Sequence, residues 1–80
     1  MQVPVIKKLV EIHTVEDLEE AEAAILDEQV PTIEIEGEDD GEQLTHVMAA
    51  IWIIEKMEKD QIPFGKAMRD YTAKVRESIN

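Results

Sequence analysis

Acidic side chains gather between Glu36 and Glu42, a composition that could hold a divalent cation. Carboxylates at positions 36, 38 and 40, followed by Gly41, imitate the first, third, fifth and sixth positions of a calcium-binding loop. The pattern then departs from that loop, because its twelfth position requires a bidentate glutamate and is Val47 here. An acidic turn that caps the following helix explains the same residues, and we predict that role.

His46 stands one helical turn after Glu42, and such a pair can supply two metal ligands or a polarised base. A catalytic metal site usually needs three protein ligands, and the only other histidine is His13. We therefore predict a local hydrogen bond between Glu42 and His46, and neither a metal nor another cofactor. The alternative function is a divalent-metal binder or metal-dependent enzyme that uses the acidic segment. Its ligands would be Glu36, Glu38, Asp40, Glu42 and His46.

Nucleophiles and phosphate-binding loops are scarce in this chain. Cysteine is absent, Ser78 is the only serine, and the three glycines form no phosphate-binding motif. Tyr71 lies near Arg69 and Lys74, but its position on an apolar stripe predicts core packing with an exposed hydroxyl. We therefore predict no catalytic residues and a protein that is not an enzyme.

Charge is distributed unevenly over the 80 residues, whose net charge is −11. Fifteen acidic residues and no basic ones lie between Leu9 and Glu55, whereas residues 56–80 hold six basic and four acidic residues. An acidic surface repels phosphate groups, so neither nucleic acids nor anionic membranes are expected partners. The missing cysteines and the lack of a leader pattern predict a cytoplasmic protein.

Apolar periodicity predicts a mainly α fold in which residues 1–80 form a single helical domain, a small three- to four-helix bundle. Residues 5–12 fit a first helix opened by Pro4, although their β-branched content also allows a strand. Thr14, with Asp17 three positions later, should cap a second helix that ends near residue 27. Residues 32–36 alternate apolar and polar side chains, which indicates one short extended segment.

A third helix is expected from about residue 40 to residue 59, with Asp39 or Asp40 as its N-terminal cap. A break at Pro63 precedes a fourth helix, on which every apolar residue of one stripe is three or four positions from the next. That stripe contains Phe64, Met68, Tyr71 and Val75.

The third helix is apolar on every side between Val47 and Ile54, and such a helix must be covered all round. Three thin neighbouring elements leave part of it open, so we predict a homodimer that associates through residues 44–57. The alternative is that the other helices bury it within a monomer, and Trp52 fits either a core or an interface position. The expected interface residues are Val47, Ala50, Ile51, Trp52, Ile53, Ile54 and Met57.

Residues 4–9, residues 36–46 with 49–53 after them, and residues 71–79 resemble a family of short acidic proteins from Bacteroidetes. The first reads Pro-Val-Ile-Lys-Lys-Leu, and the second contains Ala49-Ala50-Ile51-Trp52-Ile53. That family has no established function and no catalytic residues to transfer. The resemblance implies an accessory role near thiol-redox proteins such as peroxiredoxins and thioredoxins. Combined with the residue pattern, it favours a non-catalytic protein–protein interaction module or accessory subunit.

Overall fold

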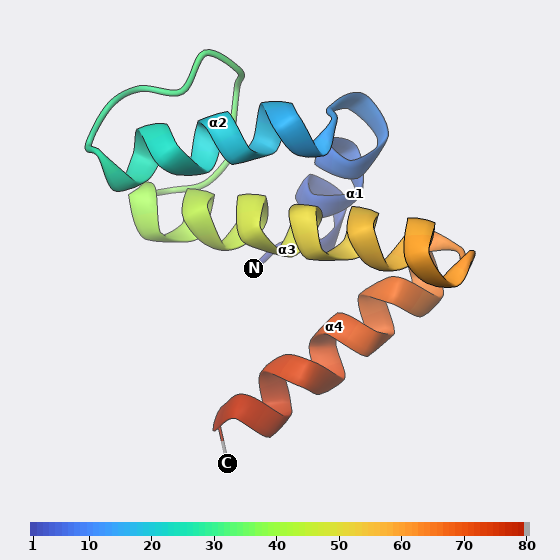
Figure 1. Ribbon diagram of the computed structural model, residues 1–80. Coiled ribbons are helices and arrows are strands. Elements are labelled where there is room, and N and C mark those ends of the chain that lie inside the picture. The colour runs from blue at the N-terminus through green and yellow to red at the C-terminus, as the bar shows by residue number, and fades with distance from the viewer. Residues whose placement is uncertain (80) are drawn as a thin grey trace.

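Four helices follow one another along the chain in a computed structural model that describes residues 1–79 (Figure 1). They are α1 (Val3–Ile12), α2 (Val15–Leu26), α3 (Asp40–Asp60) and α4 (Phe64–Ile79). Within residues 1–79 there is no β-strand. The prediction of a small, mainly α bundle is therefore confirmed.

The first two helices begin where local chemistry favours a helix start. Pro4 occupies the first turn of α1, where its missing N–H costs no hydrogen bond. The Thr14 hydroxyl accepts a 3.2 Å hydrogen bond from the backbone N–H of Asp17, whose carboxylate accepts a 3.3 Å bond from the N–H of Thr14. This complete capping box confirms the predicted start of α2 and limits the connection between α1 and α2 to two residues.

The third helix is also bounded by its own residues. The Asp39 carboxylate accepts a 2.8 Å hydrogen bond from the backbone N–H of Glu42, which selects Asp39 as the N-terminal cap. At the other end Gln61 adopts a left-handed conformation with φ of 53°, and the N–H of Ile62 returns to the carbonyl of Met57 at 3.3 Å. Pro63 follows directly, so the chain turns sharply into α4.

The loop between α2 and α3 includes residues 32–36, where the alternating pattern indicated an extended segment. No strand forms there: residues 32 and 33 bend, residues 34–36 have no regular secondary structure, and the alternating side chains serve packing instead of strand pairing. Ile35 is buried and Ile33 is partly buried against the helical core, whereas Glu34 faces solvent. The apolar residues of the alternating pattern thus pack this loop against the helices.

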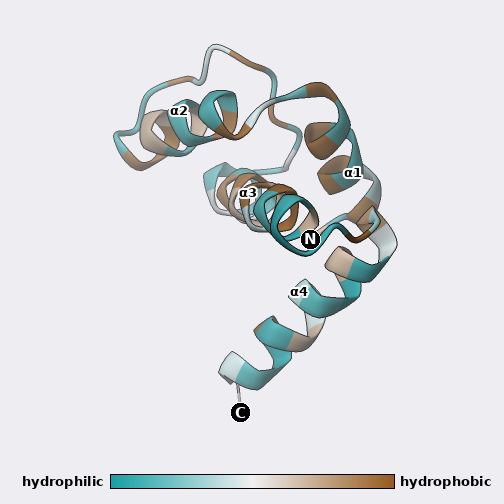
Figure 2. Ribbon diagram, turned by 45° about the vertical axis from the view of Figure 1, so that its right-hand side comes forward, coloured by the Kyte–Doolittle hydropathy of each residue, from teal (hydrophilic) through white to brown (hydrophobic). Residues whose placement is uncertain are grey.

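The long helix α3 is the centre of the molecule, because α1, α2 and α4 all pack against it. Helix α2 runs antiparallel to α3 on one side, α4 leaves from the opposite side, and α1 lies behind α3 in the view of Figure 1. The view of Figure 2 agrees and shows brown, apolar segments of α1 and α2 turned toward α3. The buried side chains of α3 are His46, Val47, Ala49, Ala50 and Ile53.

Membrane insertion finds no support in these helices. Within residues 1–79, none combines the length and the apolar character that a membrane crossing requires.

Candidate interaction surface

In the acidic turn before α3, two carboxylates accept hydrogen bonds from backbone N–H groups near the start of the helix. Besides the Asp39 cap, a carboxylate oxygen of Glu42 accepts a 3.3 Å bond from the backbone N–H of Glu38. The side-chain amide of Gln43 donates to the carbonyl of Gly37 at 3.4 Å. A Cβ atom at Gly37 would lie 2.9 Å from the backbone nitrogen of Gln43, so glycine permits this close turn.

The alternative metal ligands do not converge. Across residues 1–79, no three His, Asp or Glu side chains are arranged to hold a metal ion. The carboxylate of Glu36 instead lies 3.9 Å from the Lys8 ammonium, and both side chains are about half exposed. The geometry therefore supports a helix cap and does not favour the metal-binding alternative.

His46 has a structural role that sequence spacing does not reveal. Its side chain is completely buried, and the ring bonds two backbone groups that are remote in sequence. The N–H of Gln2 donates to Nε2 at 3.0 Å, and Nδ1 lies 2.8 Å from the carbonyl oxygen of Glu36. Since a carbonyl only accepts and an N–H only donates, the ring is neutral with its proton on Nδ1. The predicted bond to Glu42 is thus replaced by a clamp between the start of α1 and the loop.

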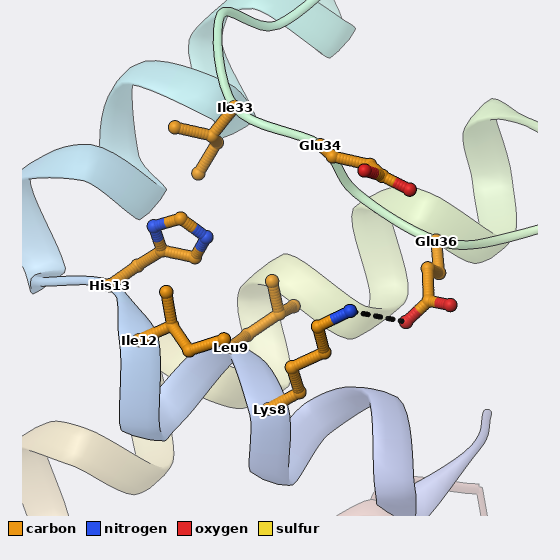
Figure 3. Close-up of a pocket in the computed structure, with 7 residues that line it drawn as sticks. All are labelled: Lys8, Leu9, Ile12, His13, Ile33, Glu34 and Glu36. Carbon is orange, nitrogen blue, oxygen red and sulfur yellow. Dashed lines mark ion pairs between the residues drawn. The ribbon is translucent and has the colours of Figure 1, made fainter.

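A cavity of about 250 Å³ lies between α1 and the loop that precedes α3 (Figure 3). Ile33 of the loop faces His13 and Ile12 across it, and the Lys8 ammonium points toward Glu36 at the opposite rim. The charged lining residues are all exposed, and the volume is below the roughly 300–1,000 Å³ typical of ligand pockets. No substrate chemistry follows from this arrangement.

Three of the residues expected in the α3 interface are buried within a single chain. Val47, Ala50 and Ile53 are each 0% exposed within a single chain, so their side chains are not available to a partner in this fold. Ile51, Trp52, Ile54 and Met57 remain partly exposed. The apolar pattern showed that α3 needs cover on every side, but it did not show which rows the other helices already cover.

One apolar strip of α3 remains accessible between α2 and α4. We call it the open face and define it as Met48, Ile51 and Trp52 of α3 together with Tyr71 of α4. Met48 is 49% exposed although it lies in the middle of the longest helix, and the other three are partly buried. Met48 was absent from the sequence-based interface, although it belongs to the same helical row as Ile51.

The aromatic pair gives the open face a defined shape. The ring centroids of Trp52 and Tyr71 are 5.6 Å apart and the rings are tilted by 54°, a favourable edge-to-face type of contact. Burial raises the pKa of the Tyr71 phenol above its ordinary value of 10.0. The Lys56 ammonium lies 5.9 Å from the centre of the Trp52 ring and forms a 2.7 Å ion pair with Asp60.

The helices on the two sides of the open face carry charge of opposite sign. On the α2 side, Glu19 and Glu22 share a shallow depression with Met48, Ile51 and Trp52, and Glu55 completes its acidic rim. On the other side, α4 presents four exposed basic residues. They are Lys66, Arg69, Lys74 and Arg76. An apolar centre with a charged border is the usual composition of a protein–protein contact surface.

These features define a small all-α protein whose central helix leaves an apolar strip accessible beside an acidic rim. A family model covers residues 1–80, and the chain therefore belongs to DUF6952, a family of unknown function. No curated protein and no solved structure is significantly similar to the chain.

Proposed function

We propose that this protein is a non-catalytic interaction module that forms a homodimer through the open face on α3. The observation that carries the proposal is the 49% exposure of Met48 beside the partly buried Ile51 and Trp52. Exposing contiguous apolar side chains to water is unfavourable, and the free energy of the system falls when a partner covers them. Closed two-fold dimers are the commonest way to provide that cover.

The size of the chain supports the same proposal. A domain of 80 residues without cysteine has no disulfide to reinforce its small core, and a partner subunit can provide that reinforcement. The cytoplasmic location and the absence of a resident cofactor belong to this proposal. A role as an accessory subunit beside thiol-redox proteins would rest on non-covalent contact, because the chain has no thiol of its own.

Light scattering after size-exclusion chromatography tests the dimer at micromolar concentration. We expect a mass close to twice the 9.1 kDa of one chain. Met48→Glu should shift the protein to monomers without unfolding it, because the site is solvent-accessible in a single chain. The matched control is Val30→Glu, which places the same charge on a side chain that is 91% exposed in the loop. A wild-type mass near 9.1 kDa would contradict the proposal.

Ile53→Glu does not serve this purpose, although its position on α3 made it the obvious choice from sequence. Its side chain is 0% exposed, so a carboxylate there would be buried within the monomer and would unfold the chain. Loss of the dimer in that variant would report on folding alone.

A further inference from the structure

The fourth helix packs against α3, as α1 and α2 also do, but its second half extends beyond that contact. Ala67 and Met68 are buried near its start, whereas most residues from Ala73 onward are exposed. Figures 1 and 2 both show its C-terminal end directed away from α1 and α2. Tyr71 and Val75 continue its apolar stripe along this projecting part.

The charges on α2 and α4 are complementary. Helix α2 carries five acidic residues and no basic ones, and within residues 1–79 none of them takes part in an ion pair. Helix α4 carries four basic and two acidic residues, and among residues 1–79 the only one of its basic groups in such a pair is Lys66, 2.8 Å from Asp70. Lys74 and Arg76 flank the Tyr71–Val75 stripe on its two sides, because successive residues advance by about 100° around a helix.

These two helices lie on opposite sides of α3 (Figure 1). The residues of the open face contact both of them, Glu19 and Glu22 of α2 in the shallow depression and Tyr71 of α4 in the aromatic pair. Two copies can meet through their open faces in two symmetric ways. If the two-fold axis is perpendicular to α3 and lies in the plane of the interface, α2 of one copy faces α2 of the other, and the five carboxylates of each helix, ten in all, come together. A two-fold axis parallel to α3 instead places α4 of each copy against α2 of the other. Opposite charges then meet twice, so electrostatics distinguishes the two arrangements.

We infer that the occupant of the open face is a second copy of this chain. The α4 helix of each copy lies along the acidic side of the α2 helix of the other. The inference rests on the proposed homodimer and specifies its arrangement. Tyr71 and Val75 of one copy approach Met48 and Ile51 of the other. Lys74 and Arg76 approach Glu19 and Glu22. The apolar strip supplies the contact area, and the charges select the orientation.

Charge reversal in two separate chains tests this arrangement. The first variant carries Lys74→Glu and Arg76→Glu, and the second carries Glu19→Lys and Glu22→Lys. In each homodimer both contacts between α2 and α4 join like charges, so we expect dissociation constants at least tenfold above wild type at low ionic strength. In the mixed dimer both contacts join opposite charges. Native mass spectrometry of an equimolar mixture should therefore show the mixed species in excess over either homodimer.

The matched control is Lys7→Glu with Lys8→Glu, which makes the same change of charge on exposed residues of α1. That helix lies behind α3, so the dissociation constant should stay within about twofold of wild type. Circular dichroism melting checks that every variant is folded.

The outcomes separate the two proposals. A monomeric wild-type protein overturns the homodimer and this arrangement together. A wild-type dimer that is weakened equally by all three variants, or that shows no preference for the mixed species, overturns only the arrangement.

Discussion

The first three helices and the fourth are held by very different amounts of burial. Among α1, α2 and α3, fully buried side chains such as Ile6, Leu18 and Ile53 meet at shared contacts, and His46 links the N-terminus to the loop. Over residues 64–78, helix α4 contributes only Ala67 and Met68 to the buried set. Local stability follows such differences, so α4 should open more easily than the rest. A binding surface requires side chains that remain accessible in the folded chain. The open face, which includes Tyr71 of α4, lies in the less buried part of the molecule.

Removing a core side chain should give the largest contrast between these regions. Leu18→Ala deletes a completely buried side chain from the contact between α2 and α3, and we expect a loss of about 2–5 kcal/mol in the free energy of unfolding. Val75→Ala on α4 removes a partly exposed side chain and should cost less than about 1 kcal/mol in a monomer. Urea titration followed by circular dichroism measures both. Equal losses would show that α4 is as firmly integrated as α2.

The buried histidine offers the next largest effect. His46→Phe keeps a ring of similar shape but leaves the N–H of Gln2 and the carbonyl of Glu36 without their partner. We expect a loss of about 1–3 kcal/mol, because two part-buried hydrogen bonds of about 0.5–1.5 kcal/mol each are removed. Hydrogen exchange should accelerate at the start of α1 more than in α4. His13→Phe is the control, because that histidine lies at the half-buried helix junction and should change stability little.

A smaller effect is expected at the cap of α3, where two adjacent aspartates can be compared. Asp39→Ala removes the acceptor for the Glu42 N–H and should cost about 0.5–2 kcal/mol, whereas Asp40→Ala leaves that bond in place and should cost less. Thermal melting distinguishes the two. The same melts with added calcium should not shift, and a calcium affinity tighter than about 10⁻⁴ M would contradict the cap interpretation.

The smallest effect concerns the junction between α4 and α3. Because burial raises the pKa of Tyr71, the only tyrosine, its absorbance should titrate above pH 10 in the native protein and near 10.0 in denaturant. The neutral phenol is the form that folding favours. Its contribution to stability is therefore complete below about pH 10 and disappears as the pH rises through the folded-state pKa. A native titration at 10.0 would show that α4 detaches from Trp52 in solution.

Sequence reasoning succeeded where a structure depends on neighbouring residues. The Thr14–Asp17 capping box, the cap of α3 and the break at Pro63 involve contacts within a few positions and were predicted from residue types, although the sequence left Asp39 and Asp40 open as the cap of α3. The same reasoning placed residues 5–12 in a helix opened by Pro4 but left a strand open, because β-branched residues fit both. In the structure these residues are helical, and α1 is stabilised by packing against α3.

The parts that could not be predicted depend on residues far apart in the chain. His46 bonds Gln2, which is 44 positions away, so its neighbour Glu42 was a misleading guide. The open face was only half predicted, because an all-round apolar pattern cannot show that Ala50 is covered while Met48 is not. Geometry supplied by α1, α2 and α4 made that distinction.

The central position of α3 also has a consequence for the order in which the chain can fold during synthesis. Helix α1 is ten residues long and α2 is twelve, and isolated helices of that length are marginal in water. Their packing partner, and the histidine that fastens Gln2, are translated later. At about 5–20 residues per second, the first half must wait a few seconds outside the ribosome before α3 emerges. The fourteen acidic residues between positions 11 and 42 would keep that waiting segment dissolved.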